Sequence, residues 1–220
     1  MRILLKFITL NKSILATSTL IATLLLSACS VTDQVKNKTT ASSKLSNKTA
    51  GFSPRAEDKY LSQEQAFKRS ERVSNVNYKL DFSLTGEESF SASSTINFDL
   101  SNNSTPLTVD LSEAKINNIV INGKEMTSEQ LLKSYNNWFI TLPAKTLKQG
   151  TNTVTVEFTR KHSTNGEGLH RFKDPVDGKV YLYSHFEPAA AQQMFALFDQ
   201  PDLKATFELT VSAPKDWTVF

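Results

Sequence analysis

The chain has 220 residues, of which 39% are hydrophobic and 21% are charged, and it carries a net charge of +3, one cysteine and three histidines. This length suffices for a domain with its own hydrophobic core, and the charged fraction together with 14 phenylalanines argues against a wholly disordered chain. A single cysteine excludes an intramolecular disulfide framework and any multi-cysteine zinc or iron–sulfur site. The small net charge gives no indication of nucleic-acid binding, and we expect no nucleic-acid partner.

The first 28 residues have the features of an export signal. Arg2, Lys6 and Lys12 precede an apolar run over residues 14–26, and small residues follow at positions 27 and 28. This apolar run is too short to cross a bilayer comfortably, because a spanning helix needs about 20 residues. The sequence therefore predicts a signal peptide over residues 1–28.

The segment Leu26-Ser27-Ala28-Cys29 resembles the lipobox of bacterial lipoproteins. That resemblance implies that cleavage leaves Cys29 as the first residue and that its thiol is acylated, which would anchor the protein in a lipid bilayer. It also implies a place on the exported side of the bacterial cell envelope, and Ser30 after the cysteine favours an outer membrane where one exists. The alternative is that Cys29 is only a small apolar residue in an ordinary signal or anchor helix.

Residues 29–60 are predicted to form a flexible tether. Fifteen of the 24 positions over 30–53 are Ser, Thr, Asn or Lys, and no hydrophobic period is visible. Such a composition cannot bury enough apolar surface to offset its chain entropy. Four lysines in this stretch could favour anionic lipid headgroups, although a solvated linker is the simpler interpretation.

Residues 61–220 have the patterns of one folded domain made mostly of strands. Ser62 and Gln65 form a capping-box pattern ahead of a helix over residues 64–72. Apolar and polar residues then alternate over 76–84 and over 90–100. Shorter alternations, turn pairs and a second short helix follow: strands at 107–111, 138–142, 154–158 and 205–211, turns at Asn122-Gly123 and Gln149-Gly150, and a helix at 128–135. Strands with one buried and one wet face predict a mainly β fold, an antiparallel β-sandwich or saddle with a few short helices.

Residues 159–178 interrupt this alternation and are predicted to form a long loop, of a kind that is often functional. The three histidines, His162, His170 and His185, lack the i, i+4 spacing that favours a metal site, so we expect them to have packing or surface roles. The sequence contains no glycine-rich phosphate loop and no G-x-S-x-G motif.

Glu187 is the carboxylate whose position suggests a function. A predicted strand over 180–183 leads into Ser184-His185-Phe186-Glu187-Pro188, followed by a predicted helix over 189–196. A carboxylate at a strand end, just before a helix, is well placed to project into a cleft. The alternative is that Glu187 only favours the positive end of that helix.

Three stretches of the sequence resemble the N-terminal domain of the aminopeptidase N family of zinc metallopeptidases: Gly168 to Gly178, Tyr181 to Pro188 and Phe198 to Phe207. The resemblance extends over roughly residues 61–220 and implies a β-saddle that packs against a thermolysin-like catalytic domain. It also implies that Glu187 binds the free α-amine of a peptide substrate. His185 matches a position, usually Gln in the family, that lines the pocket for the first side chain.

The motifs that carry the family's chemistry, H-E-x-x-H and G-x-M-E-N, are absent from this sequence. We therefore expect an N-terminal fragment of a zinc aminopeptidase, which acts on peptides with a free N-terminus when joined to its catalytic domain. The zinc would belong to the full-length enzyme, and the chain alone is expected to bind none and to be inactive. The alternatives are a stand-alone, lipid-anchored β-module that binds peptides or partners, and an inert remnant.

Overall fold

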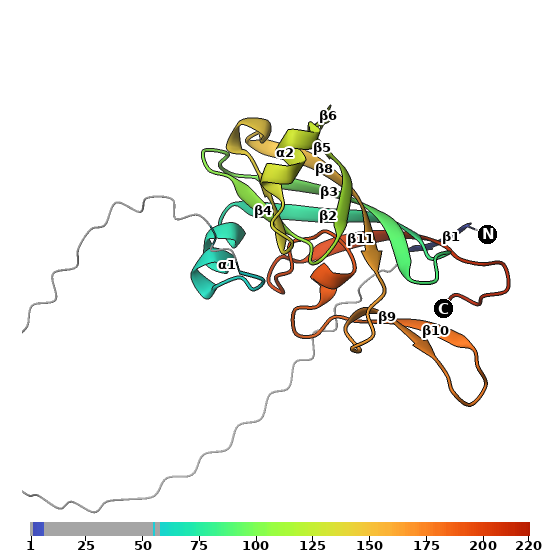
Figure 1. Cartoon of the computed structure of the whole chain (residues 1–220). Coiled ribbons are helices and arrows are strands. Elements are labelled where there is room, and N and C mark those ends of the chain that lie inside the picture. Colours follow the sequence, from blue (N-terminus) through green and yellow to red (C-terminus); the bar gives the residue numbers. More distant parts are fainter. Residues whose placement is uncertain (1, 7–54, 56–57) are drawn as a thin grey trace, which may run out of the picture. The chain divides into compact units, whose positions relative to one another are not determined.

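The computed structural model describes residues 2–6, 55 and 58–220 (Figure 1). The predicted signal peptide, Cys29 and almost all of the predicted tether lie outside these residues. Among the described helices, none is long and apolar enough to cross a membrane.

A seven-stranded sheet forms the centre of the domain (Figure 1). Its strands are, in spatial order, β1 (Arg2–Lys6), β11 (Ala205–Ser212), β2 (Val73–Ser83), β3 (Ser89–Leu100), β8 (Gly150–Lys161), β5 (Lys115–Ile121) and β6 (Lys124–Glu125). Every neighbouring pair is antiparallel except β11 and β2, which run parallel.

Two small sheets and short helices complete the described domain. Their bounds are β4 (Leu107–Asp110) with β7 (Phe139–Leu142), β9 (Gly168–Lys173) with β10 (Val180–His185), the helices α1 (Gln63–Ser70) and α2 (Ser128–Ser134), and the 3₁₀ turns η1 (Ala144–Thr146) and η2 (Ala191–Gln193). The β9–β10 hairpin projects from the rest of the fold at the lower right of Figure 1.

One hydrophobic core joins the large sheet to the β4–β7 pair. Alternate residues of β2, β3 and β8 face inward, and Tyr78, Ile96 and Val156 are at most 2% exposed. Val109 on β4 and Ile140 on β7 are fully buried in the same cluster. The period-two pattern of the sequence therefore corresponds to a sheet with one buried face.

The other face of the sheet is polar and hydrogen-bonded to itself. Asn77 donates from Nδ2 to Oγ1 of Thr206 at 2.8 Å, and Asn97 donates to Oδ1 of Asn77 at 3.4 Å. Thr153 donates from its hydroxyl to Oδ1 of Asn97 at 2.8 Å. This row crosses four adjacent strands, so the wet face supplies its own hydrogen-bond partners.

The structure confirms the mainly β prediction and both α-helices, each of which begins with a capping box at Ser62 or Thr127. The sheets are antiparallel as predicted, with one parallel pair, β11 and β2. The predicted loop over 159–178 contains the end of β8 and all of β9. The predicted helix over 189–196 is also wrong, since only the short turn η2 forms there.

Tertiary hydrogen bonds explain the missing helix. The carbonyl oxygen of Gln192 accepts from the backbone N–H of Ser112 at 2.8 Å, and the N–H of Ala196 donates to the hydroxyl of Ser94 at 3.1 Å. In a helix, these two groups of Gln192 and Ala196 would have bonded to each other. Contacts with distant strands have replaced the local bond that a helix needs.

Candidate functional site

The candidate site lies at the end of β10, where the hairpin leads into η2. The hairpin pairs His185 with Gly168 at its base, and Glu187 follows two residues beyond the strand. Both His185 and Glu187 are exposed. The structure therefore brings the two predicted substrate-binding residues together at one exposed position, as their sequence spacing requires, while Cys29 lies outside the described residues.

One face of the hairpin is aromatic and exposed. Phe172 lies opposite Tyr181, and His170 lies opposite Tyr183, with the last two ring centroids 4.8 Å apart. Phe172, Tyr181 and Tyr183 are 44%, 45% and 49% exposed. Because side chains alternate along a strand, these residues share a face with His185.

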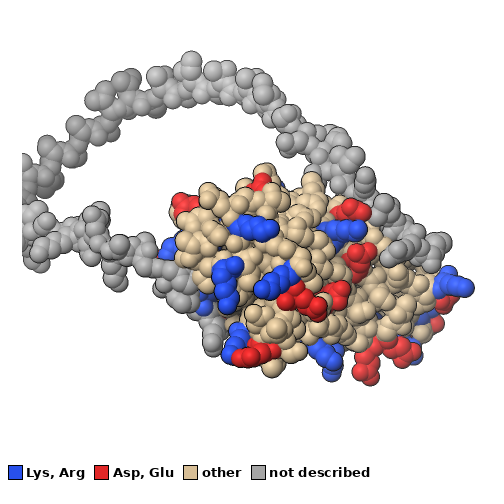
Figure 2. Space-filling model, turned by 90° about the horizontal axis from the view of Figure 1, so that it is seen from above, with Lys and Arg blue, Asp and Glu red and all other residues tan. Residues whose placement is uncertain are grey.

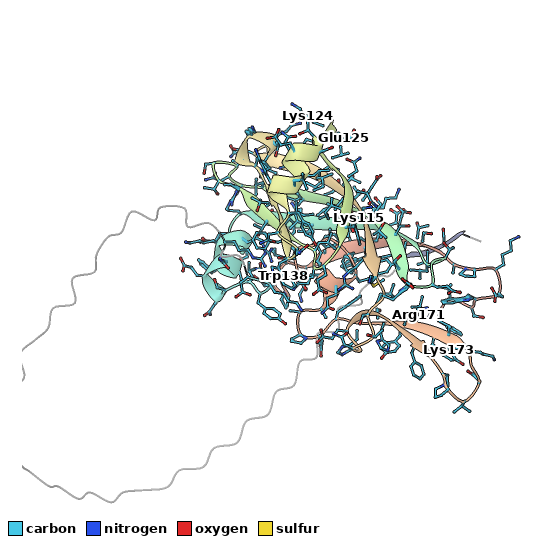
Figure 3. The ribbon with its side chains drawn as sticks, in the orientation of Figure 1. Lys115, Lys124, Glu125, Trp138, Arg171 and Lys173 are labelled. Atoms are coloured by element: carbon cyan, nitrogen blue, oxygen red, sulfur yellow. The ribbon has the colours of Figure 1, made fainter. Side chains whose placement is uncertain are left out.

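The opposite face of the hairpin attaches it to the domain. Leu169 is 4% exposed within the main core, and Leu182 packs against that core. Arg171 and Lys173 alternate with the aromatic residues along β9, and Figure 3 shows both extending from this strand. The aromatic face is therefore the one that the domain leaves uncovered.

Aromatic contacts hold the segment that carries Glu187. The Phe186 ring meets the Phe195 ring edge-on at 5.8 Å, and the Phe186 carbonyl accepts from the N–H of Ala190 at 2.8 Å. Phe195 in turn contacts Tyr78 and Phe207 at centroid distances of 6.2 and 6.3 Å. The backbone beside Glu187 is thereby tied to β2 and β11 of the large sheet.

A close backbone approach fixes the base of the hairpin against η2. Gly168 has a φ of +63°, and a Cβ at this position would lie 2.7 Å from Cβ of Gln193. The Gln193 amide also donates to Oε2 of Glu167 at 2.7 Å. Glycine is required here both by the left-handed backbone and by the space.

A buried polar cluster joins β4 and α1 to the residues that follow η2. Asp110 is 2% exposed and is paired with Arg55 and, at 2.8 Å, with Arg69. Asp110 also accepts from the N–H of Asp199 at 2.9 Å, and Arg69 donates to the Gln200 side chain at 2.8 Å. The cluster links α1, β4 and the segment after η2, and no single sequence motif indicated it, because its members are far apart along the chain.

Asp199 has an altered acidity in this cluster. The pKa of its carboxyl group is raised to about 6, chiefly by burial and also by the negative charge of the nearby Asp110. The Asp199 carboxylate accepts a hydrogen bond from the N–H of Gln192, the middle residue of η2, at 3.1 Å. This hydrogen bond acts in the opposite direction and lowers the pKa.

The described residues do not fit a zinc site. No group of three or more His, Cys, Asp or Glu side chains in residues 2–6, 55 and 58–220 is arranged to hold a metal ion. His162 is buried, its Nε2 lies 3.2 Å from the Gly86 carbonyl oxygen, and burial lowers its pKa. His170 instead accepts at Nδ1 from the N–H of Gly166 at 3.0 Å.

Charges of both signs are mixed on the surface of the domain. Figure 2 shows Lys and Arg interspersed with Asp and Glu on the face that it presents. That face has no large area of one sign, of the kind that attracts a polyanion.

Comparison with known proteins identifies the domain. Residues 74–220 match the family model described as the peptidase M1 N-terminal domain. The chain is 36% identical over 162 residues to aminopeptidase N of Streptomyces lividans, covering 72% of this chain and 18% of that protein. It is 40% identical over 73 residues to probable M1 family aminopeptidase 1 of Encephalitozoon cuniculi, covering 33% of this chain and 8% of that protein.

Solved structures share the fold at lower sequence identity. Yeast LTA4 hydrolase in complex with bestatin matches with a TM-score of 0.54 and 20% identity, over 74% of this chain and 25% of that one. Aminopeptidase A of Legionella pneumophila in complex with aspartic acid matches with a TM-score of 0.53 and 15% identity, over 64% of this chain and 16% of that one. The chain thus spans at most a quarter of the length of these relatives. Most of it matches the N-terminal domain that the family model describes. It belongs to the peptidase M1 family and consists largely of that family's N-terminal domain.

Proposed function

We propose that this domain holds the free α-amine of a peptide substrate through Glu187, as the N-terminal part of a zinc aminopeptidase. The observation that carries the proposal is the position of Glu187, an exposed carboxylate beside His185 on backbone that is tied to the large sheet. In this proposal the zinc and the groups that activate water lie outside the described residues.

A fixed carboxylate restricts cleavage to the first peptide bond for a physical reason. An ammonium group held at one position sets the distance between the start of the peptide and the reacting carbonyl. A charge-assisted hydrogen bond of this kind contributes roughly 1.5–3 kcal/mol. His185, on the same strand end, would contact the first side chain of the peptide.

The uncovered apolar residues near Glu187 support a domain that packs against more polypeptide. We call Phe172, Tyr181, Tyr183, Phe186 and Phe207 the apolar flank; each is between 36% and 49% exposed. Phe186 and Phe207 both contact the Phe195 ring, and the other three residues share one face of the hairpin. Exposed apolar residues of this kind mark interaction sites. The wet face of the sheet, in contrast, is polar and satisfied by its own hydrogen bonds. This difference favours a catalytic domain docked at the flank over a stand-alone module.

Kinetics of a longer polypeptide that carries the H-E-x-x-H motif would test the role of Glu187. Glu187→Gln should lower kcat/KM for peptides with a free N-terminus by roughly 10- to 150-fold, which corresponds to the loss of about 1.5–3 kcal/mol. The matched control is Glu157→Gln, which alters an exposed carboxylate on the wet face of the sheet. An unchanged kcat/KM for Glu187→Gln would exclude the proposed role.

We also propose that Cys29 anchors the protein to a membrane of the bacterial envelope, the outer membrane where one exists, through acyl chains on its thiol. The support is the lipobox-like sequence and the basic, apolar segment before it. In a bacterial host, the unaltered protein should sediment with membranes and carry the mass of the acyl groups. Cys29→Ser should lose both properties, and membrane sedimentation that persists in this variant would contradict the anchor.

A further inference from the structure

β11 lies between β1 and β2 near one end of the large sheet, and its inward face is less covered than that of β2. Its inward-facing residues Phe207, Leu209 and Val211 lie opposite Tyr78, Leu80 and Phe82 of β2. The three β2 residues are 2–4% exposed, whereas Phe207 is 40% exposed and the other two β11 residues are half-buried. β11 therefore has the alternation of an interior strand but lacks the cover that an interior strand has.

The structure shows that this edge accepts an antiparallel strand. β1 pairs with it from Arg2 opposite Ser212 to Lys6 opposite Glu208. Among the residues that the structure describes, none pairs on that side with the first three residues of β11, Ala205 to Phe207. β1 also belongs to residues 1–28, whose predicted cleavage before Cys29 would remove it and expose the whole edge.

A second segment is placed to take the same edge. After β11 the chain forms a turn in which the N–H of Trp217 donates to the carbonyl of Pro214 at 3.1 Å. Thr218, Val219 and Phe220 follow with alternating exposure, Val219 being the more buried. A chain that reverses within a few residues of a strand returns antiparallel to it, and loops of this length are common in hairpins.

We propose that the outer edge of β11 is a docking edge whose own partner is the return strand that begins at Thr218, and that β1 occupies this edge in its place. The return strand is joined to β11 by five residues, Ala213 to Trp217, whereas β1 is separated from it by most of the chain. The shorter connection gives the return strand a higher effective concentration at the edge. In the hairpin, Ser212 pairs with Thr218 and Thr210 pairs with Phe220.

The proposal assigns a partner to an edge that would otherwise be open. An unpaired strand edge with alternating apolar residues is a template for association with other chains. Occupation by the return strand covers Leu209 and Val211 and closes that template. This inference does not depend on the peptide-binding role of Glu187.

Disulfide trapping in the full chain tests the proposal, with Cys29→Ser in every variant so that only introduced cysteines react. The first reporter, Leu4→Cys with Thr210→Cys, joins a residue pair of β1 and β11. The second, Thr210→Cys with Phe220→Cys, joins the predicted pair of the return strand. Antiparallel partners lie within the Cα separation that a disulfide tolerates.

Two prolines in β1 should weaken its pairing with β11, so that the return strand occupies the outer edge of β11 in its place. Ile3→Pro with Leu4→Pro removes adjacent backbone donors, one of which must face β11. In this background, the yield of the second reporter should rise several-fold over the chain with unaltered β1. Thr17→Pro with Ser18→Pro, outside β1, is the matched control and should leave the yield low.

An off-register pair, Thr206→Cys with Phe220→Cys, should stay at background in all backgrounds. Equal yields for this pair and for the second reporter would overturn the proposed register. A second-reporter yield that stays low in the β1 proline variant, while circular dichroism shows an intact fold, would overturn the proposed partner. So would a disulfide-linked dimer as the main product, because the edge would then bind a second copy of the chain.

Discussion

At the scale of single residues, Asp199 makes the stability of the domain depend on pH. Its pKa is raised from 3.8 to about 6, chiefly by burial, so the folded state binds its proton more tightly than the unfolded state. The contribution of this group to the free energy of unfolding is therefore greatest below pH 4 and declines as the pH rises through about 6. Above pH 6 the Asp199 carboxylate is ionised in the folded state, where burial disfavours its charge, so this contribution to stability is lost.

Asp199→Asn should remove this decline. The variant keeps an acceptor for the Gln192 N–H, and at pH 7.5 it should be more stable than the unaltered chain by about 2 kcal/mol, with the difference vanishing near pH 4. Urea unfolding of both proteins across this pH range measures the effect. Asp216→Asn, at an exposed residue, serves as the control. An Asp199→Asn difference that is the same at pH 4 and pH 7.5 would contradict the assignment.

Asp110 should be the most sensitive carboxylate of the domain. Its replacement by Asn leaves Arg55 and Arg69 without the negative charge that they share, in a site where all three side chains are at most 5% exposed. Removal of one partner from a buried ion pair costs roughly 3–5 kcal/mol. Denaturant unfolding of Asp110→Asn should show a loss of this size.

The helix-surface pair of Glu64 and Lys68 provides the contrast. Both side chains are largely exposed, so Glu64→Gln should leave the denaturation midpoint nearly unchanged. Equal losses in the Asp110 and Glu64 variants would mean that burial does not determine the strength of these pairs.

At the scale of elements, the contact between β9 and η2 depends on one glycine. Gly168→Ala places a methyl group 2.7 Å from Cβ of Gln193, on backbone with φ of +63°. Gly178→Ala, in the turn of the same hairpin, has a similar φ of +71° but no atom within 4 Å. The first variant should be less stable than the second by about 1–3 kcal/mol, because crowding adds to the backbone strain that both share.

Thermal and urea unfolding of the two glycine variants would measure this difference. Equal losses of stability would show that only the left-handed backbone matters at position 168. A change in the fluorescence of Tyr183 or Tyr181 confined to Gly168→Ala would show that the hairpin has also moved.

Elements that depend on local pattern could be predicted from the sequence, and those that depend on distant partners could not. Strands β2 and β3 alternate cleanly, and the capping boxes at Ser62 and Thr127 mark both α-helices. The 189–196 segment has helical composition, yet Ser112 and Ser94 bind the backbone groups that a helix would use. Strand β9 was missed because its outward face is aromatic, so that its two faces do not alternate in polarity.

The same distinction applies to the candidate site. Glu187 and His185 could be placed together because they are neighbours at the end of one strand. The polar cluster around Asp110 could not be predicted, because Arg69 lies 41 residues away and Gln200 joins Arg69 across 131 residues. In the apolar flank, Phe186 and Phe207 both contact the ring of Phe195, although they lie far apart in the sequence, and only the fold brings them together.

At the scale of the whole molecule, the 220-residue chain alone should not cleave peptides. Purified chain is expected to contain no stoichiometric zinc and to leave aminoacyl-nitroanilides intact, since H-E-x-x-H is absent from the sequence. Elemental analysis and a chromogenic assay with added zinc measure both properties. Metal-dependent turnover would show that this chain contains a catalytic group that neither its motifs nor its described residues indicate.

The ion pair between Arg55 and Asp110 sets a limit on how far the chain can be shortened. A polypeptide begun at Leu61 would retain every element from α1 onward, but Asp110 would keep only one of its two guanidinium partners. It would also lose the Arg55 group that stacks 4.1 Å from the centre of the Phe139 ring. A recombinant form intended for crystallisation should therefore begin before Arg55, even though the first helix starts eight residues later.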